Sequence, residues 1–185
     1  MFVIPVKKTK AASPMKSWEP GPTAESRFTD EEMKQIKLPE YRFDSVEEAT
    51  AFIFPGWTLV DCGPDMEPGL LPKYRGKKDV LLTHPKKRGV PCFLVREVEI
   101  PAGQTTRLNL SVSHHEAGDW DLIVKINGEE LKRQSIDKNS VDSKGWADFS
   151  IDLSKYAGKK VKIELLNQPS DWICEAGYWA KIELN

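Results

Sequence analysis

From Trp57 to the end of the chain, several short runs of residues alternate strictly between apolar and polar side chains. In residues 108–112 every second side chain is aliphatic and those between are polar, and residues 161–165 repeat the pattern. A period of two places the aliphatic side chains on one face of a β-strand, which is typical of antiparallel sheets that cover a core on one side. The pattern predicts an all-β protein, an antiparallel β-sandwich.

Turn signals separate these runs at intervals of about 8 to 12 residues, as in sandwiches and barrels. Asn127-Gly128 indicates a tight hairpin because both residues tolerate a positive φ. Residues 101–104 and 155–159 are similarly compact reversals. The runs expected to form strands are residues 57–62, 80–84, 92–100, 106–113, 120–126, 130–136, 146–153, 160–167 and 177–184.

Residues 1–54 differ in texture, and we expect them to form an arm or linker before a sandwich domain of residues 55–185. Residues 1 to about 28 carry four prolines among polar residues and show no sustained period. Two capping boxes follow, Thr29 to Glu32 and Ser45 to Glu48, and each predicts a helix of one or two turns.

Charge and motifs exclude several classes of function. The formal net charge of -1 gives no footprint for nucleic acid, and no stretch approaches the roughly 18 apolar residues that a membrane span needs. The first eight residues are too short and too broken for a secretory signal peptide. There is no nucleophile elbow, phosphate loop or dinucleotide fingerprint, so we expect a protein that is not an enzyme.

The segment from Trp146 to Leu165 resembles a characteristic stretch of sequence in galactose-binding-like jelly rolls, a group that includes carbohydrate-binding modules. The matching residues are Asp152-Leu153-Ser154, then Tyr156-Ala157-Gly158 and an immediate further strand. The closing run 177–184, with its Trp-Ala pair, resembles their last strand. The resemblance covers about residues 57–185. It implies a jelly roll, an extracellular or periplasmic location and a possible structural calcium ion.

Connections in an antiparallel sandwich alternate between its two ends, because each strand crosses from one end to the other. Residues 84–91, 114–119, 137–145 and 168–176 should therefore share one end, which we call the loop end. Functional residues favour loops on a rigid scaffold. The candidate carbohydrate-binding residues at this end are His114, His115, Asp119, Trp120, Asp171, Trp172 and Glu175.

Trp120 and Trp172 each follow an aspartate at the predicted loop end. The flat face of an indole suits the C–H face of a pyranose, and neighbouring carboxylates can orient hydroxyls. Either tryptophan can instead plug the end of the core. The same loops offer the carboxylates and carbonyls that calcium prefers, although the sequence defines no metal site.

Two functions remain open, and a glycoside-active enzyme that uses Asp171 and Glu175 as its carboxylate pair is a less favoured third. The first is a non-catalytic module that binds carbohydrate through the loop end. The second is a structural or protein-interaction domain that packs against a partner or a neighbouring domain. Exposed Trp120 and Trp172 favour sugar binding, whereas buried tryptophans and an apolar sheet face favour interaction.

The three cysteines form no Cys-x-x-Cys pair. If residues 63–78 are a simple connection, Cys62 lies at the opposite end and only Cys92 and Cys174 share the loop end. We therefore expect either a Cys92–Cys174 disulfide or three reduced thiols.

Overall fold

The computed structural model describes residues 43–185; the predicted arm of residues 1–28 and the capping box at Thr29 lie outside them. The unit Phe43–Asn185 contains one helix, a 3-10 turn and ten strands. These elements are α3 (Val46–Ile53), β1 (Thr58–Val60), β2 (Gly69–Tyr74), β3 (Lys77–Thr83), β4 (Cys92–Glu99), β5 (Arg107–His114), β6 (Trp120–Ile126), β7 (Glu129–Ile136), β8 (Ala147–Asp152), η1 (Ser154–Tyr156), β9 (Lys160–Gln168) and β10 (Gly177–Leu184).

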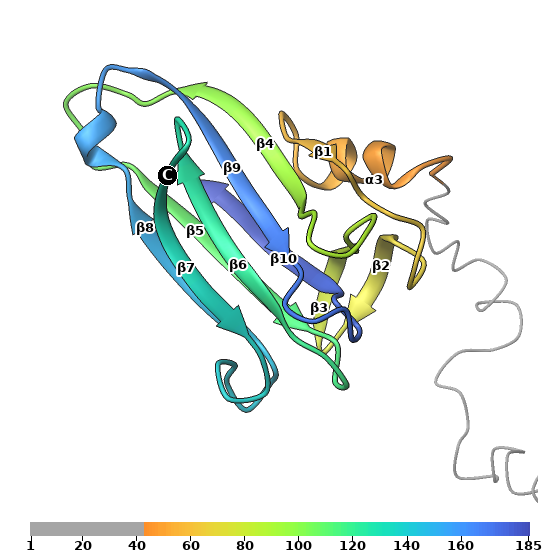
Figure 1. The fold of residues 1–185 in the computed structure, drawn as a ribbon. Helices are drawn as coiled ribbons and strands as arrows, with labels where there is room; N and C mark the ends of the chain where they lie inside the picture. The colour runs from red at the N-terminus through yellow and green to blue at the C-terminus, as the bar shows by residue number, and fades with distance from the viewer. Residues whose placement is uncertain (1–42) are drawn as a thin grey trace, which may run out of the picture. The chain divides into compact units, whose positions relative to one another are not determined.

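The strands form two stacked, five-stranded antiparallel sheets, which confirms the predicted sandwich (Figure 1). One has the order β1-β4-β9-β6-β7 and is called the β9 sheet here; the other has the order β2-β3-β10-β5-β8 and is called the β10 sheet. The β9 sheet faces the viewer in Figure 1. No helix within residues 43–185 is long and apolar enough to cross a membrane.

The core lies between the sheets and is built by the alternating side chains. Val161, Ile163 and Leu165 of β9 are all buried, whereas Lys160 and Lys162 are exposed. Trp120 of β6 and Trp179 of β10 meet across the core with their ring centroids 5.2 Å apart. Their burial contributes to the hydrophobic free energy that holds the two layers together.

The strand registers bring the predicted long connections to one end. Cys92 pairs with Asn167, and Gly177 pairs with His114. Each of these four residues adjoins a long connection, so the loop end predicted by strand counting is confirmed. It lies at the lower side of the view in Figure 1.

β2 is a strand that the sequence analysis missed, because Pro72 and two glycine-containing turns interrupt its pattern. It pairs with β3 through a hairpin at Arg75-Gly76, where both φ angles are positive. Because strands alternate in direction along the chain, one additional strand between β1 and β3 reverses the direction expected for β1. Cys62 consequently lies at the loop end.

Of the two expected states of the cysteines, the structure has three free thiols and no Cys92–Cys174 disulfide. Cys62, not Cys174, is the cysteine whose thiol influences the pKa of Cys92. The predicted position of Cys62 was wrong because residues 63–78 are not a simple connection.

The β2–β3 hairpin folds back onto the outer face of the β10 sheet. At Asp79 φ is 53°, so β3 departs from the extended conformation just before residues 81–83, the segment that pairs with β10. At the tip, the ring of Tyr74 stacks on Tyr178 with centroids 4.0 Å apart. The Trp146 indole N–H donates to the carbonyl of Arg75 at 3.0 Å. A second, smaller apolar cluster therefore forms outside the main core.

α3 confirms the second predicted capping box. The Ser45 hydroxyl accepts from the N–H of Glu48 at 3.1 Å, and the Glu48 carboxylate accepts from the N–H of Asp44 at 2.9 Å. Ala49 and Thr50 are buried, and Phe54 belongs to the main core. The helix that the sequence division places in the arm is thus packed with the sandwich.

Gly145 allows the hairpin tip to dock, and replacing it tests that contact. Its φ is +82°, and a Cβ there would lie 2.3 Å from Arg75 Nη1, which donates to the Gly145 carbonyl and to Ser113 Oγ. We predict that Gly145→Ala lowers the free energy of unfolding by about 2–3 kcal/mol. In an Arg75→Ala background the loss should fall to about 1–2 kcal/mol. Urea unfolding of the four variants measures both values, and equal losses in the two backgrounds would contradict the docking contact.

Candidate functional site

Glu175 organises the loop of residues 169–176, which connects β9 to β10. Its fully buried carboxylate accepts from the backbone N–H groups of Ser170 (3.0 Å), Asp171 (2.9 Å) and Trp172 (2.6 Å). Three successive N–H groups that converge on one carboxylate compensate for its removal from water. Glu175 therefore holds this loop in a single conformation.

The same loop carries two residues with left-handed backbone geometry. Trp172 has a φ of 83° and Cys174 a φ of 52°, which are uncommon values for residues other than glycine. Such conformations persist only where surrounding contacts hold them, and they concentrate at binding sites. The hydrogen bonds to Glu175 supply those contacts.

This geometry turns side chains of the loop outward. Trp172 is half-exposed, Asp171 is exposed and Ile173 retains 59% of its accessible surface. One side of the Trp172 ring meets the edge of His84, with centroids 5.4 Å apart and planes at 69°. His84 is itself buried, and its Nδ1 lies 2.9 Å from the Pro85 carbonyl. The half-exposed indole is thus supported by a buried histidine ring.

Asp119 joins the loop from the neighbouring connection. The Ser170 hydroxyl lies between Asp119 Oδ1 and Glu175 Oε1 and shares its one proton between them. Carboxylate oxygens of Asp119, Asp171 and Glu175 lie within 4.8 Å of one another. Among the ion pairs of residues 43–185, none joins a basic side chain to these three.

Trp120 does not take part in this surface. It is completely buried, packs on Trp179 and donates its indole N–H to the Ser113 carbonyl at 3.0 Å. As the first residue of β6 it faces inward, opposite Ile136. Its interpretation as an exposed stacking platform was wrong, and it closes the end of the core.

The two adjacent histidines stabilise the turn between β5 and β6. His114 is buried, with Nδ1 2.6 Å from the His115 carbonyl and 2.8 Å from the Gly118 carbonyl. His115 is half-exposed and accepts from the N–H of Ala117 at 3.2 Å. The structure therefore brings together four of the predicted residues, Asp119, Asp171, Trp172 and Glu175, and gives His114 a structural contact instead.

The two connections that carry this cluster meet at Gly118. A Cβ at Gly118 would lie 2.2 Å from the Ile173 carbonyl oxygen and 2.5 Å from that of Cys174. Only glycine allows such a close approach of two backbones. Asp119 reaches Ser170 because this approach is possible.

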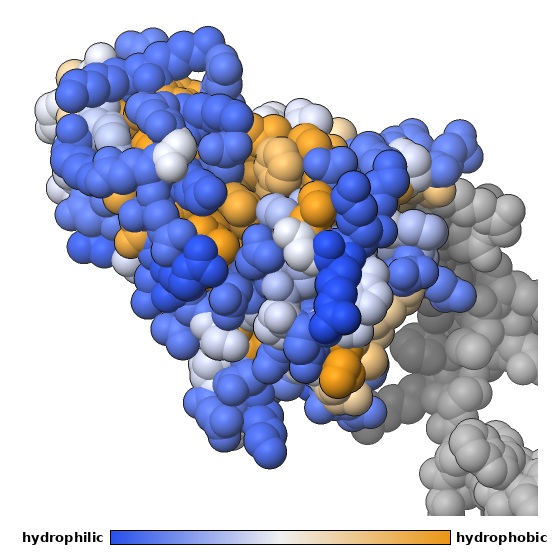
Figure 2. All heavy atoms as spheres, viewed as in Figure 1, coloured by the Kyte–Doolittle hydropathy of each residue, from blue (hydrophilic) through white to orange (hydrophobic). Residues whose placement is uncertain are grey.

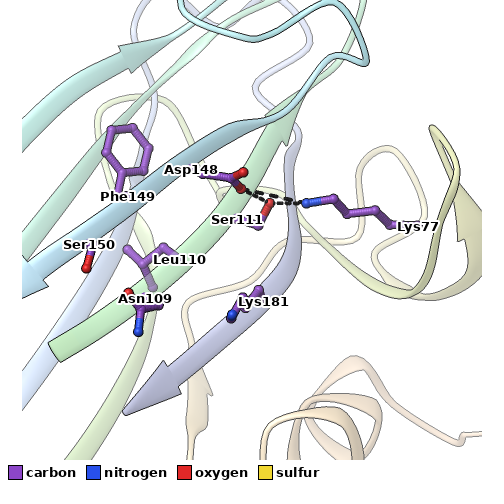
Figure 3. A pocket seen from close by; sticks show the side chains of 8 residues that line it. All are labelled: Lys77, Asn109, Leu110, Ser111, Asp148, Phe149, Ser150 and Lys181. Atoms are coloured by element: carbon purple, nitrogen blue, oxygen red, sulfur yellow. Dashed lines mark hydrogen bonds and ion pairs between the residues drawn. The ribbon is translucent and has the colours of Figure 1, made fainter. Parts of the chain in front are cut away.

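A recess that the sequence analysis missed lies on the outer face of the β10 sheet (Figure 3). Its volume is about 440 Å³. Lys77 enters from the hairpin tip, with its Nζ 4.5 Å from the centroid of Trp146 and 3.7 Å from Asp148 Oδ1. The buried Ser111 hydroxyl accepts from Lys77 and donates to Asp148. The lining residues are Lys77, Asn109, Leu110, Ser111, Asp148, Phe149, Ser150 and Lys181.

A second recess of about 450 Å³ shares Asp148 and Phe149 with the first and extends towards Gln134 and Ser140. Both volumes fall in the range of small-molecule sites, about 300–1,000 Å³. In the sequence, the polar members of these linings are the polar half of ordinary alternating strands. Only the position of the hairpin tip, which no local pattern predicts, distinguishes them from a plain solvent face.

No protein-family profile matches the chain. An uncharacterized protein of Archaeoglobus fulgidus is 32% identical over 163 residues, covering 72% of this chain. The chain spans about 40% of that relative's length.

Among solved structures, the K3 adhesin domain of Lys-gingipain from Porphyromonas gingivalis superimposes with a TM-score of 0.52 at 12% identity, covering 72% of this chain and 92% of that domain. The described unit has the fold of that domain. A family 35 carbohydrate binding module from an environmental isolate superimposes with a TM-score of 0.49 at 14% identity, covering 70% and 86% of the two chains. The xylan-binding CBM22-1 domain of Paenibacillus barcinonensis Xyn10C gives 0.47 at 12% identity, covering 70% and 85%. The structural neighbours thus include the carbohydrate-binding jelly rolls that the sequence resemblance named.

Replacing Glu175 with glutamine tests its control of the loop. The amide keeps the volume but turns an N–H₂ group towards backbone N–H donors, so buried groups lose their partners. We predict that Glu175→Gln lowers the free energy of unfolding by about 2–3 kcal/mol, whereas the exposed Asp171→Asn changes it by less than about 1 kcal/mol. Chemical denaturation measures both variants. A loss for Glu175→Gln no larger than for Asp171→Asn would contradict the assignment.

Proposed function

We propose that this chain is a non-catalytic carbohydrate-binding module whose ligand stacks on Trp172 at the loop end. The observation that carries the proposal is the half-exposed indole on a loop that Glu175 holds in one conformation. A ring that is already placed loses little conformational freedom when a ligand binds, so more of the contact energy becomes affinity.

The neighbouring groups suit hydroxyl recognition. Asp171 is exposed, and its Oδ1 accepts a hydrogen bond from the N–H of Ile173 at 2.8 Å. Asp119 is half-exposed and is held through Ser170. Carboxylate oxygens beside an aromatic face are the combination that binds a pyranose through its C–H face and its hydroxyls together.

The arrangement of the carboxylates supports a binding role over glycoside hydrolysis. Hydrolysis requires two carboxyl groups on opposite sides of the scissile bond, about 5–9.5 Å apart. Glu175 is fully buried and occupied by backbone N–H groups, so it cannot reach a substrate. Asp119 and Asp171 belong to one cluster whose carboxylate oxygens lie within 4.8 Å of one another.

The recess on the β10 sheet is a competing position for the sugar. Asp148 is 73% exposed at its side chain and retains one oxygen outside its contacts with Ser111 and Lys77. Phe149 is the aromatic residue in the recess, but Lys132 lies over its ring at 5.4 Å. We favour the loop end because its half-exposed indole lies beside the exposed Asp171 and the half-exposed Asp119.

We extend the proposal to a calcium ion at the acidic cluster. Calcium binds carboxylate and carbonyl oxygens from loops, and close carboxylates repel one another unless a cation lies between them. Asp119 and Asp171 would be the ligands with an available oxygen. Glu175 would contribute mainly by fixing the loop, since its oxygens already accept hydrogen bonds.

A row of apolar side chains supports the second candidate function, a domain that packs against a protein partner. Val60, Phe93, Leu166 and Ile123 are consecutive neighbours across β1, β4, β9 and β6. Their chain neighbours point into the core, so this row lies on the outer face of the β9 sheet. Figure 2 shows apolar side chains gathered on this face over β4 and β9. Ile123 and Leu166 are nearly covered, which leaves Phe93 and Val60 as the accessible part.

The intact chain should bind a glycan, and Trp172→Ala should weaken that binding by on the order of tenfold or more. The ligand is first identified on a glycan array and then titrated by calorimetry. The melting temperature of Trp172→Ala should stay within about 2 °C of the parent, because a half-exposed side chain contributes little to folding. Asp148→Ala, in the recess, is the matched control and should bind normally.

Loss of binding in Asp148→Ala with full binding in Trp172→Ala would move the site to the recess. Failure of the intact chain to bind any glycan, together with capture of a protein partner that Phe93→Glu abolishes, would favour the interaction domain.

Calcium at millimolar concentration should raise the melting temperature by a few degrees over that in EDTA. In Asp171→Asn the calcium effect should disappear while the melting temperature in EDTA stays unchanged. Differential scanning calorimetry measures both. Identical melting curves of the parent chain with calcium and with EDTA would rule the ion out.

A further inference from the structure

Cys62 and Cys92 approach each other from neighbouring strands. β1 pairs with β4 in the register Leu59 opposite Leu94 and Val60 opposite Phe93. Simple continuation of that register would turn Asp61, not Cys62, towards the core. Asp61 instead has a φ of 56°, and this left-handed residue shifts the alternation by one position. Cys62 therefore packs against the core to which Cys92 belongs.

The two thiols influence each other's ionisation, as expected for side chains that pack in the same part of the core. The Cys62 thiol also lies 3.7 Å from the Gly63 carbonyl oxygen. Neighbouring antiparallel strands place Cα atoms about 4.5–5.5 Å apart, and disulfides span Cα distances of about 4.4–6.8 Å. Continuation of the β1–β4 register puts Asp61 opposite Cys92, so Cys62 follows directly after the position that faces Cys92.

The two sulfurs differ in reactivity. The neighbouring Cys92 thiol and the backbone N–H of His84 lower the pKa of Cys62, whereas the neighbouring Cys62 thiol and burial raise the pKa of Cys92. Cys62 is also half-exposed, while Cys92 is 1% exposed. A small oxidant can therefore reach the sulfur that ionises more readily.

We propose that Cys62 and Cys92 are a disulfide-forming site that covalently links β1 to β4 under oxidising conditions. Glutathione disulfide is a sufficient oxidant. The Cys62 thiolate attacks one of its sulfurs and releases one glutathione. Cys92 then loses its proton and attacks Cys62 of the mixed disulfide, which releases the second glutathione. Two protein thiols are oxidised, and one glutathione disulfide is reduced to two thiols.

The link would enclose β2 and β3 in a covalent loop. β1 is a short edge strand that pairs only with β4, so it is the strand of the β9 sheet with the fewest contacts to hold it. A disulfide at the end of β1 would fix the point where the chain leaves the β9 sheet and continues to the β2–β3 hairpin. It would thereby restrain the segment that carries Lys77 to the recess.

Cys174 is the remaining thiol and serves as an internal reference. It belongs to the loop of residues 169–176, and its Cβ lies against Gly118. Cys174→Ser reduces the problem to two sulfurs without changing either partner of the proposed bond.

The test uses the full chain and Cys174→Ser, each equilibrated in glutathione buffers from reducing to oxidising. Thiols are counted with Ellman's reagent after denaturation, and linked peptides are identified by mass spectrometry. We expect the count to fall from three to one in the parent and from two to zero in Cys174→Ser, both thiols disappearing in one step. The linked peptide should join Cys62 to Cys92, and reduction should lower the melting temperature by about 5–10 °C.

Cys62→Ser provides the second arm, since its half-exposed position tolerates the change better than the buried Cys92. This variant should form no internal bond and show no dependence of melting temperature on the glutathione buffer. Separate glutathione adducts on Cys62 and Cys92 without a linked peptide would overturn the proposal. A peptide that links Cys92 to Cys174 would overturn it as well.

Discussion

The side chain of Asn167 joins the two sheets where the candidate binding loop leaves them. It is fully buried on β9, and its amide group donates to the carbonyl and hydroxyl of Thr83 on β3 and to the carbonyl of Glu175. The Thr83 hydroxyl also accepts from the indole N–H of Trp179 at 2.9 Å. A Cβ at Gly177 would lie 2.7 Å from the Asn167 amide nitrogen, so glycine is required beside it. In a buried network each member depends on the others, because any orphaned group would lose its hydrogen bonds to water without replacement.

Two sets of hydrogen bonds connect this network to the surface of the loop end. Asn167 fixes the backbone of Glu175, and the Glu175 carboxylate then gathers three backbone N–H groups of the loop. Gly118 allows the β5–β6 connection to approach the same loop closely, which brings Asp119 into contact with Ser170. The half-exposed position of Trp172 is the result. A rigid sandwich with a preorganised loop is the arrangement that favours affinity without catalysis.

Much of the fold follows from local pattern, whereas the site depends on tertiary contacts. A period of two residues predicted nine of the strands and the loop end, because alternation and antiparallel crossing are local rules. β2 was not predicted because Pro72 breaks its alternating pattern. Because this strand was missing from the count, Cys62 was assigned to the wrong end of the sandwich. Trp120 and Trp172 share the same Asp-Trp context, yet one is the first inward residue of β6 and the other has a left-handed backbone conformation in a loop. The recess and the Cys62–Cys92 contact arise from segments far apart in sequence, so no local signal distinguishes them.

The indole N–H resonances of the six tryptophans provide the most direct measurement of the central claim, that Trp172 is the ligand-contacting aromatic. In ¹H–¹⁵N spectra of the intact chain titrated with its glycan, the Trp172 indole signal should shift. The signals of Trp120, Trp146 and Trp179 should stay in place, because their N–H groups donate to Ser113, Arg75 and Thr83 inside the protein. An unmoved Trp172 signal, with shifts confined to the side-chain amide of Asn109 in the recess, would contradict the account.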